Sequence, residues 1–515
     1  MRQPVDLRPY GRAIPLQGSL RPVDASMSEP DTQPTTPAIT EVTRMRAAVD
    51  ISLQLLGRSA NVVLGVVVTL VLARHLGPRD FGRWSTIFAV FQITGYFGNL
   101  GFEQAAVARC AAEPEREPQW LGALVALRLL LALPVFLATT GIMLLVARGG
   151  EMRLAGVIVC AMLLVSGLGS LRAVFQLRVR NHVTAWFELA NGILWGIGVI
   201  LVAAAGGRLV ALAAVFLGTA AATILLQAAV AVHQARISFA GVAARARTLA
   251  RVAIPIGIGG LLILAYVRID QVLVFELASP DAAGDYGAAY RVLDRVQLLP
   301  DAFLATLFPL LVSAYRVDSA RLRRLVQTAF DYLLMLSLPL LAFTVVASEP
   351  IVELLFGGRF EAASRALPIL MGAFVLIALG YLGGNLVIVL DRQKTFVRYA
   401  LLALVVNVVG NVVLIPPYGF VAAAWMTLAT EAVVLALTAR LVFREAGFRP
   451  GFGRTARASA ASIAMACGVW LLRSQAHAGL GPLVAAAVVL YPGLLFALRA
   501  VSTTELRQLA RREEL

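Results

Sequence analysis

The stretch GRSANVVLGVVVTLVLARHLGPRDFGRWSTIFAVFQITGYFGNLGFEQAAVARCAA, residues 57–112, decides the fold. Two apolar runs flank the turn LGPRDFG, and each is long enough for a helix to cross a hydrocarbon core of about 30 Å. Along the whole chain, including these two, there are about fourteen such runs, each near 20 residues. The 515 residues are 59% hydrophobic with a mean hydropathy of +0.80, too apolar for a soluble domain. We therefore predict an all-α, polytopic membrane protein.

Short polar loops separate the predicted spans. These spans are 48–75, 81–106, 119–147, 152–173, 183–206, 209–233, 252–277, 284–313, 321–348, 362–390, 395–416, 419–441, 455–473 and 480–500. Every second loop is rich in arginine, for example around Arg245, Arg323 and Arg444. The positive-inside rule places these loops and both termini in the cytoplasm. We therefore predict a multi-pass protein of the inner (cytoplasmic) membrane, and the net charge of +15 requires no nucleic acid partner.

Changes of composition divide the chain into parts. Residues 1–45 are polar and rich in Pro, Thr, Ser and Arg, so we expect a disordered cytoplasmic tail. Residues 235–251 mix apolar and basic side chains, which predicts an amphipathic helix on the inner leaflet. This linker separates an N-lobe of six spans, 46–234, from a C-lobe of six spans, 252–445. Residues 446–515 contribute two more spans and a cytoplasmic tail.

An internal repeat relates the two lobes. The segment LARHLGPRDFGRWSTIFAV, residues 72–90, is similar to FELASPDAAGDYGAAYRVL, residues 275–293. Each leaves a helix through a turn containing Pro and Asp, and then reads Gly-x-aromatic as the next span begins. We therefore predict that the lobes are repeats related by a pseudo-two-fold axis.

Charged residues lie inside several predicted spans. Span seven holds Arg268 and Asp270, and span eight holds Arg291, Asp294 and Arg295 on one helical face, because spacings of three and four return to the same side. A charge at the centre of a bilayer costs about 3 kcal/mol, so these groups are expected to face a cavity or one another.

Other polar residues extend this set. Arg58 and Asn61 lie in span one and Arg128 in span three, where arginines outnumber carboxylates. For any single residue the alternative is an ion pair or hydrogen bond that only fixes helix packing. For the whole set we favour a polar cavity, and the planar fork of arginine suits phosphate. The predicted substrate cavity comprises Arg58, Asn61, Arg128, Arg268, Asp270, Arg291, Asp294 and Arg295. Candidates for coupling to H⁺ or Na⁺ are Asp331 and Glu431, together with Asp270 and Asp294.

The sequence lacks motifs of enzymes and ATP-driven pumps. It contains no GxxxxGK[ST] phosphate loop, no HExxH and no GxSxG, and its three cysteines are isolated. The outward loops are short, the longest being about SEPIVELLFGGRFEAAS, which leaves no room for a catalytic domain. We therefore expect a transporter without a bound cofactor.

Three segments resemble the polysaccharide flippases of the multidrug/oligosaccharidyl-lipid/polysaccharide exporter (MOP) superfamily, the Wzx-type translocases. Residues 57–112 are similar to the opening pair of spans, with the turn R-x-L-G-P-x-x-[FY]-G. Residues 266–296, YVRIDQVLVFELASPDAAGDYGAAYRVLDRV, are similar to the R-x-D and G-x-Y-x-x-A-x-R patterns of spans seven and eight. Residues 350–374, PIVELLFGGRFEAASRALPILMGAF, resemble the turn before span ten. The resemblance covers residues 48–445.

This resemblance implies a function. A member of this family flips undecaprenyl-diphosphate-linked oligosaccharide to the outer leaflet by alternating access, for O-antigen, capsule or exopolysaccharide, with polysaccharide polymerase or export machinery as candidate partners. The motif positions imply Arg58, Arg268, Asp270, Arg291 and Asp294 as cavity residues. The alternative within the superfamily is an ion-coupled multidrug antiporter, which needs carboxylates in its first lobe. A non-transporting membrane scaffold would instead tolerate loss of every charge inside the membrane.

Overall fold

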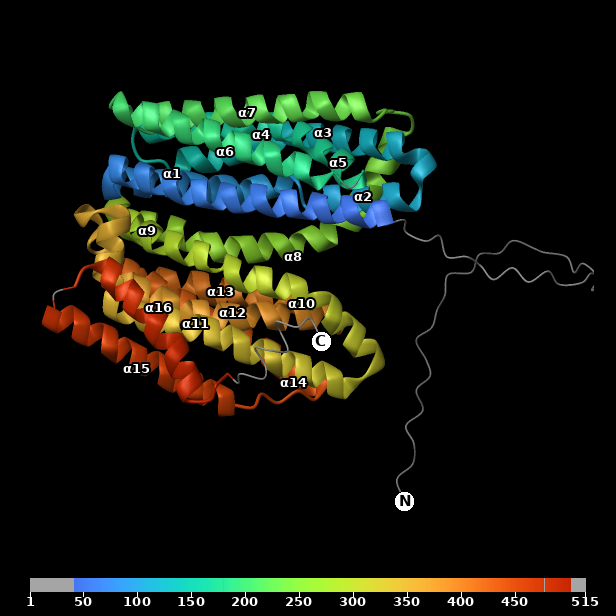
Figure 1. Cartoon of the computed structure of the whole chain (residues 1–515). Coiled ribbons are helices and arrows are strands. Elements are labelled where there is room, and N and C mark those ends of the chain that lie inside the picture. The colour runs from blue at the N-terminus through green and yellow to red at the C-terminus, as the bar shows by residue number, and fades with distance from the viewer. Residues whose placement is uncertain (1–40, 179, 477, 502–515) are drawn as a thin grey trace, which may run out of the picture. The chain divides into compact units, whose positions relative to one another are not determined.

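The computed structural model describes residues 41–178, 180–476 and 478–501, without the side chains of 41–55, Arg58, Ile256 and Arg316. Residues 49–515 form one compact unit, to which the following account applies. Across these described ranges all regular secondary structure is helical, which confirms the predicted all-α class (Figure 1). Residues 1–40 of the predicted tail 1–45 lie outside the described residues, and α1 begins at Glu41.

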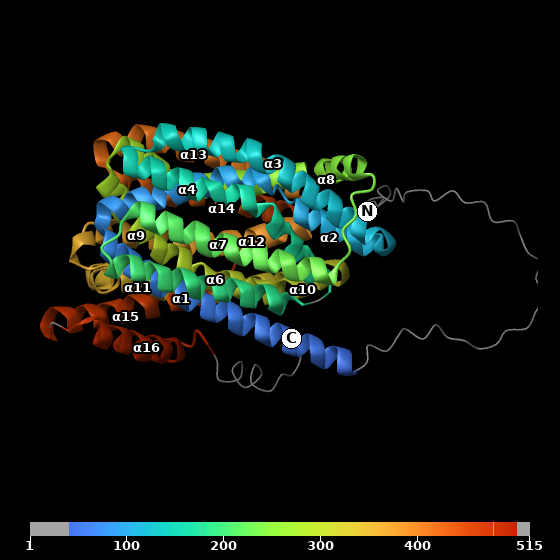
Figure 2. The ribbon, with the colours of Figure 1, turned by 90° about the horizontal axis from the view of Figure 1, so that it is seen from above.

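The helices form two groups, one above the other in Figure 1. The first group is α1 (Glu41–Gly95), α2 (Phe102–Ala112), α3 (Glu117–Val146), α4 (Gly150–Ser166), α5 (Ala173–Leu177), α6 (Asn181–Ala204) and α7 (Leu209–Gln234). The second is α8 (Val242–Leu277), α9 (Pro280–Val296), α10 (Leu298–Val317), α11 (Ser319–Phe356), α12 (Ala363–Val389), α13 (Gln393–Tyr418) and α14 (Phe420–Ala446). Two further helices, α15 (Gly453–Ala476) and α16 (Leu480–Ala497), pack on α11 at the edge of the bundle (Figure 2).

Twelve of the described helices are long and apolar enough to cross a membrane, or thirteen if the bent pair α4 and α5 is one span. One of the twelve runs over 54 residues, Ser59–Ala112. Held straight it would be about 80 Å long, more than twice the thickness of a hydrocarbon core. Its backbone breaks at Gly77, where φ is 71°, a conformation that favours glycine, and Pro78 then opens the next helical segment.

Contacts with α6 show that the chain folds back at this break. Val68, before Gly77, packs against Gly196, and Trp84, after Gly77, stacks on Trp195 with ring centroids 5.9 Å apart. Residues on both sides of the break therefore meet the same turn of α6. Counting the two arms separately, and the bent pair α4 and α5 as one span, brings the spans among the described residues to the predicted fourteen.

The two lobes exchange equivalent contacts. A Cβ atom on Gly82 would overlap the carbonyl oxygen of Pro280, and one on Gly284 would overlap the carbonyl oxygen of Pro78. Pro78 and Gly82 occupy the places in the first repeat that Pro280 and Gly284 occupy in the second. A two-fold axis produces such a reciprocal contact, so the packing confirms the predicted pseudo-two-fold relation. We call these four residues the Gly82–Gly284 contact.

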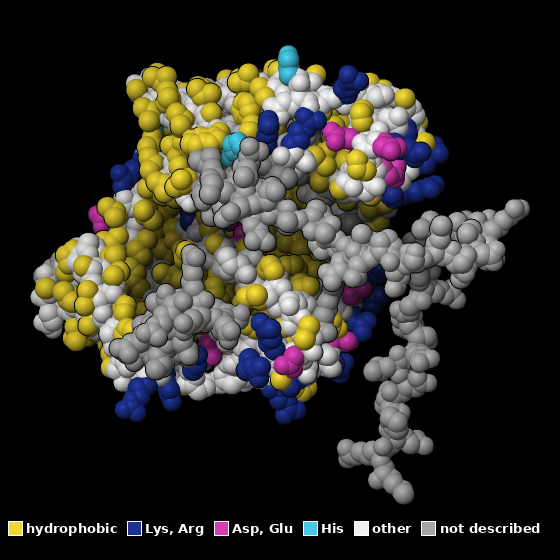
Figure 3. Space-filling view, turned by 45° about the vertical axis from the view of Figure 1, so that its right-hand side comes forward, with side chains coloured by type: hydrophobic (Ala, Val, Ile, Leu, Met, Phe, Trp, Pro, Cys, Tyr) yellow, Lys and Arg dark blue, Asp and Glu magenta, His cyan; other side chains and the backbone are white. Residues whose placement is uncertain are grey.

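Further contacts between the lobes lie near the same end. Arg148 Nη2, in the loop after α3, lies 3.0 Å from Glu276 Oε2 on α8. Arg74 donates to the carbonyl oxygen of Leu354, and Arg359 donates to that of Arg74. The lobes are therefore joined at the end of the bundle that holds the Gly82–Gly284 contact. Figure 3 is turned so that the end of the bundle away from this contact comes forward, and it shows a recess between the two groups of helices with hydrophobic side chains on its walls.

Large apolar side chains such as Leu130, Leu145 and Val489 are exposed on the helices. Lipid surrounds such positions in a membrane protein, so the chain is a multi-pass membrane protein as predicted. The predicted linker helix is not separate: residues 242–251 form the first turns of α8 and continue directly into the span. Residues 242–254 contain no Gly or Pro, so nothing stops the helix between the linker and the span.

Candidate functional site

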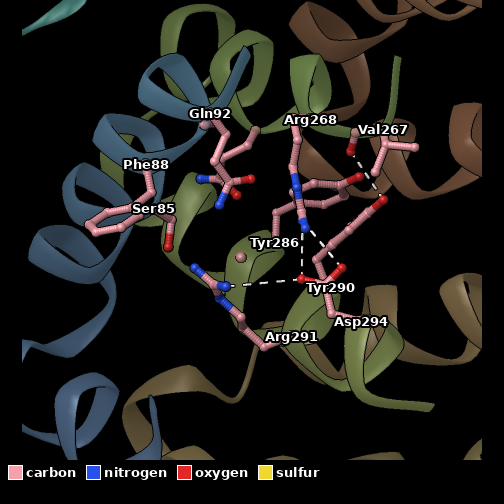
Figure 4. Close-up of a pocket in the computed structure, with 12 residues that line it drawn as sticks. Ser85, Phe88, Gln92, Val267, Arg268, Tyr286, Tyr290, Arg291 and Asp294 are labelled. Atoms are coloured by element: carbon pink, nitrogen blue, oxygen red, sulfur yellow. Dashed lines mark hydrogen bonds and ion pairs between the residues drawn. The ribbon is translucent and has the colours of Figure 1, made fainter. Parts of the chain in front are cut away.

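Two arginines share one carboxylate where the lobes meet. Arg268 on α8 donates through Nη1 to both Asp294 oxygens, at 3.2 and 3.1 Å, and Arg291 Nη1 lies 4.0 Å from Asp294 Oδ2 (Figure 4). Arg291 and Asp294 are three residues apart on α9, so the helix places them on one face. The three side chains carry a net charge of plus one, and all are only partly exposed.

Tyr290 fixes the position of Arg268. Its ring centroid lies 5.6 Å from the Arg268 guanidinium, and its hydroxyl donates to the Val267 carbonyl oxygen at 3.1 Å. The facing wall comes from α1 and carries no charge. Its side chains are Ser85, Phe88 and Gln92 (Figure 4). The cavity therefore has a cationic wall from the C-lobe and a neutral wall from the N-lobe, which we call the Arg268 cavity.

Two other predicted cavity residues lie on or against α1. Arg295 Nη2 would be 3.2 Å from a Cβ on Gly65, so this arginine reaches from the C-lobe to the N-lobe. Asn61, about one turn earlier, packs against Gly192 on α6. The side chain of Arg58 lies outside the described residues, so its predicted place in the cavity stays a prediction.

Arg128 lies in a different cavity, inside the N-lobe. Its Nη1 donates to Asn99 Oδ1 at 2.7 Å and its Nη2 to the Ser166 carbonyl oxygen at 3.0 Å. This cavity measures about 300 Å³, and we call it the N-lobe chamber. It also holds Glu103 and Arg172, which were not among the site residues predicted from the sequence. A carboxylate in an otherwise apolar part of residues 57–112 was the signal for Glu103.

Asp270 faces away from the arginines, although it lies two residues from Arg268. Its Oδ1 accepts from Asn411 Nδ2 at 2.8 Å. Its Oδ2 accepts from the hydroxyls of Tyr286 at 3.0 Å and Thr427 at 2.8 Å. Only 2% of Asp270 is exposed, and none of the salt bridges among described residues includes it. The predicted common cavity therefore separates here, because residues two apart point to opposite sides of a helix.

Glu431 lies in the same buried region as Asp270, and we call these two carboxylates the Asp270–Glu431 cluster. It is buried on α14 and lines a cavity of about 10 Å³ together with Asp270, Asn407 and Thr430. Isolated buried carboxylates cost several kcal/mol unless a proton or a cation offsets their charge. A space of this size fits one small ion or one water molecule. The arrangement is therefore chemically suited to take up a proton or a small cation.

Asp331 lies apart from this cluster. Its Oδ1 accepts from Gln327 Nε2 at 3.0 Å, and its Oδ2 lies 4.0 Å from Arg454 Nε on α15. The Arg454 guanidinium also lies 5.8 Å from the Tyr332 ring centroid. These contacts attach α15 to the C-lobe, and the ion-coupling role predicted for Asp331 stays a prediction.

Comparison with known proteins agrees with this fold. The family model "Polysaccharide biosynthesis protein" matches residues 48–314. A curated relative, the "Probable low-salt glycan biosynthesis flippase Agl15" of Haloferax volcanii, is 25% identical over 169 residues. That match covers 33% of this chain and 36% of the relative, so the aligned part spans about a third of each.

Solved structures extend the likeness over most of the chain. The lipid II flippase MurJ, in an inward closed conformation, aligns with a TM-score of 0.73 at 13% identity, covering 87% of this chain and 99% of MurJ. An inward-facing multidrug resistance MATE transporter of the MOP superfamily aligns with a TM-score of 0.62 at 14% identity, covering 77% and 98%. Identities this low concern the fold alone. The resemblance to MOP-superfamily flippases is confirmed, and with the family match over half of its length, the chain belongs to the polysaccharide biosynthesis protein family.

Proposed function

We propose that this protein flips oligosaccharides linked to undecaprenyl diphosphate from the inner to the outer leaflet of the cytoplasmic membrane. The observation that carries the proposal is the Arg268–Asp294–Arg291 group at the lobe interface. Two guanidinium groups share one carboxylate there, so a diphosphate, with more charge and more acceptor oxygens than Asp294, binds them more completely. The oligosaccharide is linked to this diphosphate, so both cross the membrane together.

Alternating access supplies the movement. The lobes are joined at the Gly82–Gly284 contact and leave a recess seen from the other side, so we assign this conformation as open to the cytoplasm (Figure 3). Both termini are then cytoplasmic, in accord with the arginine-rich loops. The isoprenoid chain stays in the bilayer while the headgroup crosses between the lobes. Polysaccharide polymerase or export machinery would receive the product.

The Asp270–Glu431 cluster supplies the coupling in this proposal. Its carboxylates lack a cationic partner among the described residues, so uptake of H⁺ or Na⁺ stabilises them. Asp331 is not part of this proposal, because it pairs with Arg454. A multidrug antiporter would use the same fold, but a pair of arginines at the interface repels the cationic compounds that such transporters export.

The test is the replacement of Arg268 or Arg291 with alanine. Each loses charge-assisted hydrogen bonds of about 1.5–3 kcal/mol, so we expect the affinity of the purified protein for undecaprenyl diphosphate to fall about 10- to 150-fold. In cells, lipid-linked glycan should accumulate on the inner leaflet. Arg153→Ala, which removes an α4 arginine outside the cavity, is the matched control. Normal surface polysaccharide and unchanged affinity in both variants would contradict the proposal.

A further inference from the structure

The N-lobe chamber is a second polar cavity, apart from the Arg268 cavity. Helices α6 and α7 supply much of its wall, together with α2, α3 and α4, and its volume is about 300 Å³. Its polar lining includes Asn99, Glu103, Arg128, Arg172, Asn191 and Gln227. Glu188 lines it too and is exposed, so the chamber reaches the molecular surface. Six interior polar groups in one lobe of a membrane protein are costly unless they serve a ligand or a network.

The charges in this chamber are balanced. Glu103 Oε1 accepts from Arg172 Nε at 2.7 Å and from Gln176 Nε2 at 3.2 Å. Arg128 and Glu188 add one further charge of each sign to the lining. The chamber therefore differs from the Arg268 cavity, where positive charge predominates. Neither a free anion nor a free cation gains a net electrostatic attraction here.

Four buried atoms of the lining lack a protein partner within the described part of the chain, and one of them is the hydroxyl oxygen of Thr184. The other three are Glu103 Oε2, Arg128 Nε and Gln227 Nε2, on residues that are only 2%, 9% and 8% exposed. An unmet buried hydrogen-bonding group costs about 1–3 kcal/mol. Glu103 Oε2 accepts, Arg128 Nε and Gln227 Nε2 donate, and the Thr184 hydroxyl can do either, so a ligand must offer both functions. A hydroxyl group both donates and accepts, whereas a cation or an anion serves only one side.

We propose that the N-lobe chamber binds the sugar portion of the lipid-linked glycan, while the C-lobe arginines bind its diphosphate. This inference rests on the proposed function. The volume lies at the lower end of small-molecule pockets, about 300–1,000 Å³, which fits one or two sugar rings. Phe187, also in the lining, offers an aromatic surface for the apolar face of a pyranose. The headgroup would then contact both lobes at once, and the chamber would set glycan preference.

Two probes separate the sugar from the diphosphate. One is the lipid-linked oligosaccharide extracted from cells in which this gene is deleted, and the other is undecaprenyl diphosphate without sugar. Binding of each is measured to the purified full-length protein in detergent. The chamber variants are Gln227→Met and Thr184→Val, which keep side-chain volume while removing a polar atom that lacks a partner among the described residues. Gln234→Met, on α7 but outside the lining, is the matched control.

We expect both chamber variants to bind the glycan-bearing lipid about 5- to 30-fold more weakly, the loss of about one or two hydrogen bonds. Their affinity for undecaprenyl diphosphate should stay within about twofold of the wild type, as should both affinities of Gln234→Met. Arg268→Ala should weaken both probes equally. If the chamber variants weaken both probes alike, or neither, the chamber is a water-filled packing network and the inference is overturned, although the arginine site stands. If the wild type binds neither probe, the proposed function itself fails.

Discussion

Replacing Gly82 with alanine would place a methyl group against the Pro280 carbonyl oxygen, far inside the 3.0 Å that real Cβ contacts respect. The neighbour is backbone at the start of α9 and cannot rotate away as a side chain would. The two helices must therefore separate at this end. We predict that Gly82→Ala shifts the protein from the conformation described here toward one in which the Gly82–Gly284 contact is open.

The size of the shift follows from the packing. Overpacking of a well-packed contact costs about 1–3 kcal/mol, and it acts only on the conformation in which the contact is formed. The ratio of closed to open protein should therefore fall about 5- to 150-fold, since each 1.4 kcal/mol is a factor of ten. Alanine also favours a helix over glycine by about 1 kcal/mol, but this gain is the same in both conformations. Gly284→Ala should act in the same direction, because its methyl group would meet the Pro78 carbonyl oxygen.

Thiol labelling measures this equilibrium. Ser85 is 5% exposed and lines the Arg268 cavity, so Ser85→Cys reports access from the end that holds the contact. The exposed Cys467 is first replaced with serine, whereas the native Cys110 and Cys160 are buried. A membrane-impermeant maleimide added outside the cell should label Ser85→Cys faster when Gly82→Ala is present.

The matched control is Gly141→Ala, at a glycine on α3 whose Cβ would meet nothing within 4 Å. It carries the same gain in helix propensity without the overlap, so its labelling rate should equal that of Ser85→Cys alone. Equal rates for Gly82→Ala and Gly141→Ala would refute the reasoning, because the contact would then not close this end. Thermal unfolding of each variant checks that faster labelling does not come from a loss of folded protein.

Two further predictions concern coupling and topology. Asp270→Asn should abolish the dependence of glycan export on the Na⁺ or proton gradient, because an amide does not carry the negative charge that a cation offsets. Asp331→Asn should keep that dependence and lower the thermal stability of the protein, because it removes the ion pair with Arg454. Export assayed while each gradient is collapsed distinguishes the two, and a retained dependence in Asp270→Asn would exclude the cluster. A cysteine in place of the exposed Asp281 should react with an impermeant thiol reagent from outside, and one in place of the exposed Arg321 should not. The reverse pattern would invert the topology.

Much of the fold could be predicted because bilayer thickness fixes helix length. The fourteen apolar runs and the turn LGPRDFG follow from hydropathy and from the backbone requirements of Gly77 and Pro78. The repeat predicted from residues 72–90 and 275–293 correctly anticipated a pseudo-two-fold axis. The contact between Gly82 and Pro280 could not be derived, because no local pattern states which backbone another helix approaches.

The candidate site was only partly predictable for the same reason. Helical spacing correctly grouped Arg291 with Asp294, and equal depth brought Arg268 beside them. The excess of arginines over carboxylates also suggested Arg128 as a cavity residue, but helices of the N-lobe enclose it in a separate chamber. Tertiary packing likewise decides that Asn411 and Thr427, from two different helices, surround Asp270. Periodicity gives the face and depth of a residue, but not the helix that it meets.

The pattern Arg-x-Asp on α8 links the two halves of the proposed mechanism. At about 100° per residue, Arg268 and Asp270 point about 200° apart, so one faces the cavity between the lobes and the other the interior of the C-lobe. Tyr286 donates to Asp270 and packs against Tyr290, which in turn supports the Arg268 guanidinium. In the proposed mechanism, a cation taken up at Asp270 therefore acts on the helix that also carries Arg268, an arginine of the proposed diphosphate site. Coupling between two binding sites is reciprocal: if the cation raises the affinity for diphosphate by some factor, diphosphate raises the affinity for the cation by the same factor. In this proposal a single helix, α8, is enough to couple the two sites.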